Sequence, residues 1–394
     1  MERITVTFVS NYINHHQLPL SNALYNDEEI DYKFIETEKM DEERIRMGWS
    51  FDTNEVPYLM RMYDEKAECE KLIMDSDIVI FGGTDDESII MPRLLSDKPV
   101  IRYSERIYKE GQWKFISPRG LIKKYKDHIR FKKKKVYMLC AGAYVASDFN
   151  LIKAYPGKMF RWGYFPAVYD YDEYDLMERK SIDEVKLLWT GRMIDWKHPE
   201  YAVEAAYYLK KNNVRFHLTM IGDGDRKENV SALINKYGLN ENVTLLGFVK
   251  PDMVRNCMMD SNIYLFTSDE KEGWGAVLNE AMNSGAAVVA SALIGAAPYL
   301  IKNNVNGMVF RNKDVSHFTK VVYDLCMDRQ KTLRLGMEGY ATVHNKWNPS
   351  EAALRLKSFM RALLNDSVEP RIDDGPLSVA PIISPKKGYK YFTD

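Results

Sequence analysis

The sequence predicts an α/β protein of two domains, each with a parallel β-sheet covered by helices. Three observations support this prediction. The chain of 394 residues is longer than one ordinary domain. Short apolar runs rich in β-branched residues alternate with helical patterns, which is typical of parallel strands joined by helices. Glycine and polar residues gather directly after several apolar runs, at the sheet edge where such proteins bind ligands.

The first predicted domain covers residues 1–168. Apolar runs predict its strands, and a helical pattern over 17–26 separates the first two; the strands are expected at 4–10, 31–37, 75–83, 98–104 and 134–142. His15 and His16 follow the first of these runs, and Gly82 and Gly83 follow the third. All four are therefore expected at the ligand-binding edge. The alternative interpretations are a capping or packing histidine and a simple turn.

The pattern restarts after the acidic and aromatic segment 164–175, which is typical of a linker, so the second predicted domain covers 169–347. Its alternation is clearer, with strands expected at 184–192, 214–225, 242–248, 261–268 and 286–291 and helices at 198–213 and 276–285. A terminal helix is expected over 348–366, with a proline near its start. The proline-containing tail 367–394 has little apolar content and is expected to be loosely attached or to wrap the surface.

Composition narrows the class of protein. With 45% hydrophobic and 28% charged residues it is an ordinary globular chain, and a formal net charge of -1 gives no global attraction to nucleic acid. Its four cysteines are far apart and form no C-x-x-C pair, which argues against a zinc site and favours a reducing compartment. No apolar stretch has the roughly 18 residues of a membrane-spanning helix, and the start lacks a signal-peptide pattern. We therefore expect a cytoplasmic protein.

Three loops of the second domain follow predicted strands and carry the chemistry. The first places Arg192 and Lys197 after "KLLW", the second holds Gly222 and Gly224 in "IGDGD", and the third spans 268–291. Cations and backbone amides bind an anion such as a diphosphate, whereas carboxylates accept hydrogen bonds from hydroxyl groups. A ligand with hydroxyl groups at both ends and a diphosphate between them is a nucleotide sugar.

The third loop supplies the carboxylates, because Glu272 and Glu280 flank Gly273 and Gly275. Glycine lets the backbone approach a ligand closely. Glu280 lies about one and a half turns inside a predicted helix, and its side chain leans back toward the helix N-terminus. The two carboxylates can therefore face opposite ends of one ligand.

Each of these residues also has a structural interpretation. Glu272 and Glu280 could be a solvated loop acid and a helix-surface acid. Arg192 and Lys197 could form surface ion pairs, with Asp195 and Glu200 as partners. The glycines of "IGDGD" could form only a tight turn.

The stretch "EGWGAVLNEAMNSGAAVVAS" resembles the E-x7-E signature of the retaining glycosyltransferases of family four, which have the GT-B fold of two Rossmann-like domains facing across a cleft. "GRMIDWK", "IGDGD", "NVTLLGFV" and "NNVNGMVF" are similar to the family's other motifs and occur in its order. The resemblance covers residues 187–347. The first domain resembles the family only in general layout.

The resemblance implies a retaining, metal-independent transfer of a sugar from a nucleotide diphosphate donor, with UDP favoured, to a glycan or a lipid-linked acceptor, and it implies no cofactor. Arg192 and Lys197 would hold the diphosphate, Glu272 would bind hydroxyl groups of the transferred sugar, and Glu280 would bind the ribose. The amides of Trp274 and Gly275 would assist. The remaining expected donor contacts are Gly222, Gly224 and Gly273, and His15, His16, Gly82 and Gly83 would lie on the acceptor side.

Two loops depart from the family pattern. The loop after the first strand is "NYINHHQLP" where the family has a glycine pair, and "IGAAPYLI" has Tyr299 near an expected Glu. These departures concern the sugar and acceptor contacts. Two other functions are open at this point: a nucleotide-sugar epimerase of the same fold, and a non-catalytic sugar-binding partner subunit.

The segment 121–135 is strongly basic, with eight Lys or Arg residues against one Asp. Leu121, Ile122, Tyr125 and Ile129 fall near one helical face. This pattern fits an interfacial helix on an anionic membrane surface, which would suit a lipid-linked acceptor. It fits a solvated basic helix equally well.

Overall fold

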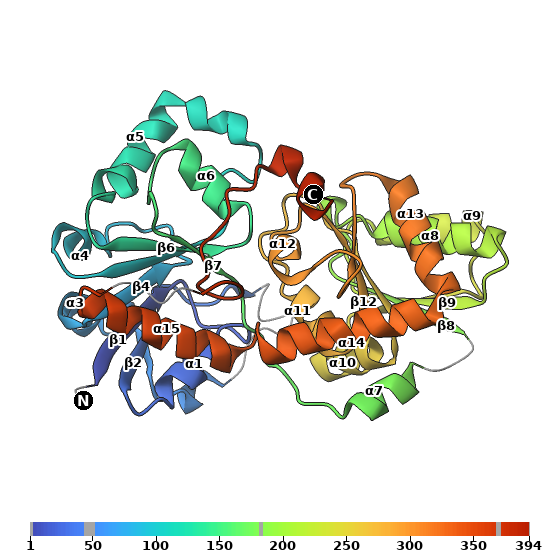
Figure 1. Cartoon of the computed structure of the whole chain (residues 1–394), viewed down its shortest axis with the longest axis horizontal. Coiled ribbons are helices and arrows are strands. Elements are labelled where there is room, and N and C mark those ends of the chain that lie inside the picture. The colour runs from blue at the N-terminus through green and yellow to red at the C-terminus, as the bar shows by residue number, and fades with distance from the viewer. Residues whose placement is uncertain (1–2, 43–51, 181–183, 368–371, 394) are drawn as a thin grey trace. The chain divides into compact units, whose positions relative to one another are not determined.

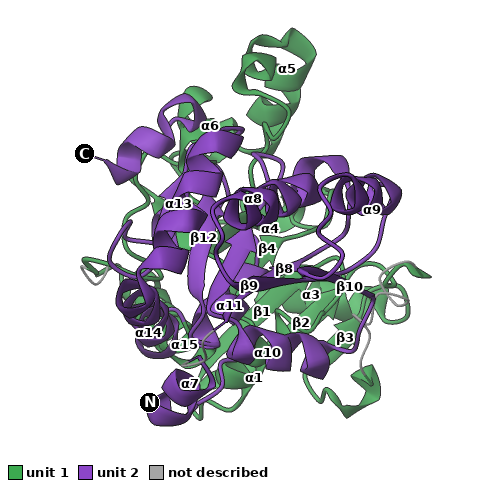
Figure 2. Ribbon diagram, turned by 90° about the vertical axis from the view of Figure 1, so that its right-hand side faces the viewer, with its two compact units in different colours: residues 1–167, 348–383 green, residues 168–347, 384–394 purple. Residues whose placement is uncertain are grey.

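The computed structural model describes residues 3–42, 52–180, 184–367 and 372–393. The chain divides into two compact units, coloured separately in Figure 2. Unit 1 comprises Met1–Ala167 and Asn348–Ile383, and unit 2 comprises Val168–Trp347 and Ser384–Asp394. None of the four cysteines, all of which are described, forms a disulfide.

Unit 1 contains a seven-stranded parallel sheet in the order β3-β2-β1-β4-β5-β6-β7. Its strands are β1 Ile4–Ser10, β2 Ile30–Glu36, β3 Leu59–Arg61, β4 Ile78–Gly82, β5 Val100–Ser104, β6 Val136–Ala141 and β7 Met159–Trp162. The sequence predicts five of these strands. It misses β3 and β7, because three or four residues are too few to show a periodicity.

Helices and short 3₁₀ turns complete unit 1: α1 Leu18–Tyr25, η1 Thr53–Glu55, α3 Lys66–Asp75, α4 Met91–Leu95, η2 Gln112–Ile116, α5 Pro118–Asp127, η3 Ile129–Phe131, α6 Val145–Leu151 and α15 Pro349–Leu364. The terminal helix α15 lies beside α1 in Figure 1 and contacts it. Lys357 of α15 forms ion pairs with Asp27 and Glu29, both at 2.7 Å. The strands and helices enclose a core of side chains such as Val9, Phe81 and Phe149.

The tail was expected to be loosely attached or to wrap the surface; residues 377–380 pair with β7 of unit 1, and residues 368–371 lie outside the described part. The amide of Leu377 donates to the carbonyl of Arg161 at 2.8 Å, and the amide of Ala380 donates to that of Met159 at 3.0 Å. The tail thus adds backbone pairing at β7, and Leu377 and Ala380 are buried. The tail contains few apolar residues, so its composition alone does not predict the burial of Leu377 and Ala380.

Unit 2 contains a six-stranded parallel sheet in the order β10-β9-β8-β11-β12-β13. Its strands are β8 Val185–Thr190, β9 Phe216–Ile221, β10 Val243–Gly247, β11 Ile263–Phe266, β12 Ala287–Ser291 and β13 Met308–Phe310. Its helices and 3₁₀ turns are α7 Glu173–Arg179, η4 Asp195–Lys197, α8 Pro199–Lys211, α9 Lys227–Lys236, α10 Pro251–Asp260, α11 Val277–Asn283, α12 Ala297–Leu300, α13 Val315–Met327, α14 Arg329–Asn345, η5 Pro385–Lys387 and η6 Tyr389–Phe392. All five predicted strands of this unit are present. The strand order reverses at β8, between β9 and β11, which places the loops after β8 and β11 side by side.

Candidate functional site

Hydrogen bonds tie the loop after β8 to the loop after β11. The amide of Asp269 donates to the carbonyl of Trp196 at 2.9 Å, and the Thr267 hydroxyl donates to the carbonyl of Lys197 at 2.6 Å. The indole Nε1 of Trp189 donates to the same Thr267 hydroxyl at 2.8 Å. These bonds fix the turn η4 against β11, so the position of Lys197 is set by groups on both strands.

Lys197 and Glu272 meet in this arrangement. The Lys197 ammonium forms an ion pair with the Glu272 carboxylate, and the side chains are only 15% and 12% exposed. The same ammonium lies 4.7 Å from the ring centroid of Trp196 and 5.7 Å from that of Phe266. Because the pair is shielded from water, its attraction is stronger than on an open surface. A ligand anion would have to compete with Glu272 for Lys197.

Glu280 lies in the same neighbourhood, as the electrostatics of Tyr264 show. The Tyr264 hydroxyl is 2.7 Å from the Thr190 hydroxyl at the end of β8. Burial raises the pKa of Tyr264, and the charges of Glu280 and Glu272 raise it further. Both carboxylates are therefore within electrostatic reach of one hydroxyl group.

The Glu280 carboxyl is itself perturbed. Burial raises its pKa, and the positive charge of Arg255 opposes that rise. An Arg255 guanidinium N–H also donates to the backbone carbonyl of Glu280 at 3.4 Å. The charged form of Glu280 is therefore unfavourable in the chain without a ligand, and hydrogen-bond donors of a ligand would stabilise it.

Asp195 and Glu200, the partners that the sequence suggests for Arg192 and Lys197, each contact another cation. Asp195 pairs with Arg226, and Glu200 accepts from His198 Nδ1 at 3.0 Å. Arg192 is partly buried in the same loop, between β8 and η4. The loop after β8 thus places Arg192 and Lys197 within a few residues of a third cation, His198.

His198 is held as a cation. Burial by itself would lower the pKa of its imidazole, but Asp269 and Glu200 on either side raise it to about 9. Its Nε2 is 3.5 Å from the Asp269 carboxylate, and its backbone has φ of 48°, in the left-handed region. His198 links the loops after β8 and β11 a second time.

The glycines of "IGDGD" are required by the packing of two loops. A Cβ on Gly222 would lie 1.9 Å from the carbonyl oxygen of Gly191, and one on Gly224 would lie 2.6 Å from that of Met193. The amide of Met193 also donates to the carbonyl of Asp223 at 2.7 Å. These contacts support the tight-turn interpretation, in which the glycines hold the loop that carries Arg192. A role in binding the donor stays a prediction.

The segment between the two glutamates is partly core. The Trp274 side chain is fully buried, its Nε1 donates to Asn279 Oδ1 at 2.9 Å, and its ring lies 6.3 Å from that of Tyr299. Gly275 has φ of +89°, and a Cβ there would lie 2.7 Å from the Phe266 ring. The Trp274 side chain is therefore part of the core of unit 2. Gly273 lies partly buried just before it.

Tyr299, which stands near the position where the family resemblance predicts a Glu, joins this aromatic cluster. Its ring stacks at 5.9 Å on Trp347, and it is 5% exposed. The departure from the family pattern thus fills a packed position of unit 2.

The predicted residues of unit 1 form a separate group. The rings of His15 and His16 lie 3.9 Å apart, and His16 stacks on Tyr164 at 6.3 Å. Burial lowers the pKa of His16 to about 3, and the neighbouring His15 lowers it too, so the ring is neutral at physiological pH. His16 and Tyr103 line a small cavity of about 10 Å³, roughly the room of one water. His16 is therefore a neutral ring on the wall of this cavity.

Gly82 and Gly83 have a packing role. A Cβ on Gly82 would lie 2.0 Å from the carbonyl oxygen of Tyr103, and one on Gly83 would lie 2.3 Å from the Ser10 hydroxyl. Gly83 also has φ of +80°. These glycines let the ends of β1, β4 and β5 come together, which is the turn interpretation.

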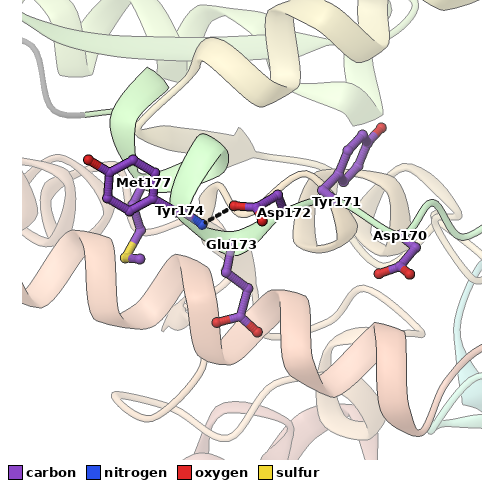
Figure 3. Close-up of a pocket in the computed structure, with 6 residues that line it drawn as sticks. All are labelled: Asp170, Tyr171, Asp172, Glu173, Tyr174 and Met177. Atoms are coloured by element: carbon purple, nitrogen blue, oxygen red, sulfur yellow. Dashed lines mark hydrogen bonds between the residues drawn. The ribbon is translucent and has the colours of Figure 1, made fainter.

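A hollow of about 670 Å³ lies away from this chemistry, at the start of α7. Figure 3 shows its lining: Asp170, Tyr171, Asp172, Glu173, Tyr174 and Met177. Asp172 is the N-cap of α7 and accepts from the amides of Tyr174 and Asp175 at 2.8 and 3.1 Å. Helix capping accounts for this carboxylate, and a lining with three acidic residues is unsuited to a diphosphate, so we do not assign the ligand to this hollow.

Sequence reasoning missed the residues that position the site: Thr190, His198, Tyr264, Thr267 and Asp269. The signal was available for Thr190, Thr267 and Asp269, which are polar residues at or just after the ends of β8 and β11, whereas Tyr264 lies within β11 and His198 follows η4. Among the described residues, no three His, Cys, Asp or Glu side chains are grouped in a way that could hold a metal ion. No helix of the described parts is long and apolar enough to cross a membrane.

Comparison with known families places this geometry in context. Residues 173–342, which include every site residue of unit 2, match the family described as glycosyl transferases group 1. The chain is 25% identical over 198 residues to the amylovoran biosynthesis glycosyltransferase AmsK of Erwinia amylovora, covering 49% of this chain and 48% of that protein. It is 24% identical over 194 residues to a GDP-mannose-dependent alpha-(1-6)-phosphatidylinositol monomannoside mannosyltransferase of Mycobacterium tuberculosis, with 48% and 49% covered. The chain thus matches about half the length of these curated relatives.

The fold is shared more widely than the sequence. The Anabaena protein HepE, solved in complex with UDP and glucose, has a TM-score of 0.67 to this chain at 13% identity, and the match covers 91% of this chain and 100% of that one. The predicted GT-B fold is confirmed by this likeness and by the two parallel sheets.

Proposed function

We propose that this chain is a glycosyltransferase that moves a sugar from a nucleotide diphosphate donor to a glycan or lipid-linked acceptor, with retention of the anomeric configuration and without a metal ion. The observation that carries the proposal is the shielded Lys197–Glu272 pair at the strand-order reversal of unit 2. It joins a cation and a carboxylate, the two chemistries that a sugar diphosphate needs, within the segment that matches glycosyl transferases group 1.

In this proposal the donor diphosphate displaces Glu272 from Lys197. The phosphates take the Lys197 ammonium as their partner, with Arg192 as the second cation of the same loop. The Glu272 carboxylate, once released, accepts hydrogen bonds from hydroxyl groups of the transferred sugar. Lys197 and Glu272 therefore pair with each other in the free chain, and in the donor complex Lys197 contacts the phosphates while Glu272 contacts the sugar.

Glu280 binds the other end of the donor. The raised pKa of its buried carboxyl means that the charged form gains from new donors, and the ribose hydroxyl groups supply them. The amides of Trp274 and Gly275 are proposed to assist near the sugar. Uridine is our proposed base, because HepE was solved with UDP; a guanosine donor is the comparison to make, since one relative is named for GDP-mannose.

The transfer step is proposed to be a front-face displacement. The bond between the sugar C1 and the diphosphate oxygen breaks while the acceptor oxygen attaches to C1 on the same face. The acceptor hydroxyl gives its proton to the departing phosphate oxygen. Lys197 and Arg192 stabilise the charge that grows on the diphosphate, which is the role a metal ion plays elsewhere.

The acceptor is proposed to bind to unit 1. His15 and the neutral His16, in the loop after β1, are the residues that we propose to contact the acceptor. AmsK is named for the biosynthesis of a polysaccharide, which supports a glycan as acceptor. We place the reaction in the cytoplasm, the reducing compartment that four free cysteines favour.

A thermal-shift series with UDP, GDP and their sugar conjugates in EDTA tests the proposal. A donor that binds the folded chain raises its melting temperature. At a hundredfold excess of donor over Kd, the free energy of unfolding rises by about 2.7 kcal/mol. We expect one base to give a shift that is unchanged by the chelator. The absence of a shift with every nucleotide at millimolar concentration contradicts the proposal, and a shift that appears only with added Mg²⁺ or Mn²⁺ contradicts metal independence.

A further inference from the structure

Unit 1 exposes a group of large apolar side chains on η2 and α5. Trp113 is 68% exposed, Ile116 66%, Ile122 60% and Tyr125 57%. These four fall within thirteen consecutive residues of the chain, and η2 and α5 contact each other. Such a concentration of solvated apolar surface is unfavourable unless something covers it.

The geometry of α5 explains why these side chains point outward. Ser117 caps the helix by accepting from the amide of Gly120 at 3.3 Å, and Pro118 begins it. The other face is anchored by Asp127, which is buried at the helix end, and by Phe131 just beyond it. Figures 1 and 2 both show α5 at the periphery of unit 1. The helix is thus held by one face and presents the other.

The structure revises the basic segment 121–135 predicted from the sequence. The helix ends at Asp127, and Ile129 turns inward to pack beside the core of unit 1. Lys134 donates to the carbonyl of Leu95 at 2.8 Å, and Lys135 pairs with Asp366, so these two cations are held elsewhere. The apolar face instead gains Trp113 and Ile116, which come before the predicted segment.

Basic residues are frequent in the sequence around the exposed apolar side chains, although Lys134 and Lys135 are held elsewhere. Residues 111–135 contain one acidic residue, Asp127, and ten basic ones: Lys114, Arg119, Lys123, Lys124, Lys126, Arg130, Lys132, Lys133, Lys134 and Lys135. Arg119 and Lys126 are exposed on α5 itself. An apolar row bordered by cations matches the boundary between the acyl chains and the anionic head groups of a membrane.

We propose that Trp113, Ile116, Ile122 and Tyr125 insert into the interfacial layer of a bilayer that contains anionic lipid, while Arg119 and Lys126 contact its head groups. We call these six residues the membrane patch. Charge complementarity selects the membrane: a nucleic acid would satisfy the cations but leave Ile116 and Ile122 in water, and a second copy of the patch would repel the first. The proposal goes beyond sugar transfer and does not depend on the donor site.

Vesicle sedimentation tests the proposal with the full chain. Wild-type protein should sediment with phosphatidylcholine vesicles that contain phosphatidylglycerol, and it should bind pure phosphatidylcholine at least tenfold more weakly. Arg119→Glu with Lys126→Glu should lower the partition coefficient at least 25-fold, at roughly fivefold for each lost cation. Trp113→Ser with Ile122→Ser should lower it at least tenfold.

Matched variants outside the patch control for charge and apolar area. Lys71→Glu with Lys387→Glu and Leu354→Ser with Val379→Ser change exposed residues elsewhere and should leave partition within twofold of wild type. Equal partition of patch and control variants overturns the proposal, as does tight binding to a nucleic acid without binding to vesicles.

A measurement on the unmodified chain guards against a misfolded variant. Brominated lipids quench an inserted indole, and Trp113 is the exposed tryptophan of the patch. We expect quenching on anionic vesicles that disappears in Trp113→Phe. Bound wild-type protein whose fluorescence is unquenched contradicts insertion.

Discussion

Replacing Gly222 by alanine should strongly destabilise unit 2. Its φ of +129° lies in a region that other residues avoid, which costs about 1–3 kcal/mol. The new Cβ would also lie 1.9 Å from the Gly191 carbonyl oxygen, where atoms rarely come within 3.0 Å, so the loops must part by about 1 Å. That movement weakens the bond from the Gly222 amide to the Gly247 carbonyl, 2.8 Å, at a cost of about 1 kcal/mol. These two costs add to roughly 2–4 kcal/mol.

Gly247→Ala is the matched control. Gly247 has φ of +67°, and a Cβ there meets nothing within 4 Å, so only left-handed strain of about 1–2 kcal/mol remains. In calorimetry, with roughly 2–4 °C per kcal/mol for a domain of this size, Gly222→Ala should lower the melting temperature of unit 2 by about 4–16 °C and Gly247→Ala by about 2–8 °C. Equal shifts for the two variants would refute the loop-packing argument.

Two further predictions use the perturbed ionisations. His198→Asn should lower the free energy of unfolding by about 1–2 kcal/mol; asparagine tolerates the left-handed φ of this position. The rise of the His198 pKa to about 9 corresponds to roughly 3 kcal/mol, and solvent screening reduces this value. Because the pKa of His198 is raised in the folded state, the variant should show its full loss of stability below pH 6.5, and the loss should vanish as the pH rises past 9. A loss that does not depend on pH in thermal melts would count against the ion pairs. Glu280→Gln should be at least as stable as the wild type at pH 7, because burial raises the pKa of the Glu280 carboxyl and its charged form is unfavourable above about pH 4.5. The same variant should bind nucleotide more weakly. A variant that is less stable at pH 7 and binds nucleotide normally would reverse this assignment.

Long periodic elements and the polar loops after them could be predicted from the sequence. The strands β4 and β11 are continuous apolar runs and β1 and β8 are mostly apolar, and the loops after β8 and β11 carry Lys197 and Glu272. Parallel topology is enough to bring such loops to one edge, so the meeting of these two side chains could be anticipated. The roles of Arg192 and Glu280 in binding were predicted from the same pattern and stay predictions.

Contacts that depend on exact distances could not be predicted. Whether a glycine serves a ligand or a neighbouring loop depends on where its missing Cβ would lie: Gly222 faces a carbonyl oxygen of the loop after β8, and Gly82 faces one of β5. The pairing of the tail with β7 joins segments about 220 residues apart and leaves no local signal. The burial of Trp274 is likewise tertiary, because an aromatic residue beside two glycines suggests a ligand contact as readily as a core position.

The most direct test of the donor site compares a nucleoside diphosphate with its monophosphate by titration calorimetry. The account predicts that the wild type binds the diphosphate at least tenfold more tightly than the monophosphate, since charge-assisted bonds contribute about 1.5–3 kcal/mol each. Lys197→Gln and Arg192→Gln should each remove most of this preference. Lys227→Gln, which changes a cation paired with Asp223 in a neighbouring loop, should keep it. A preference for the diphosphate that survives in both Lys197→Gln and Arg192→Gln would contradict the account.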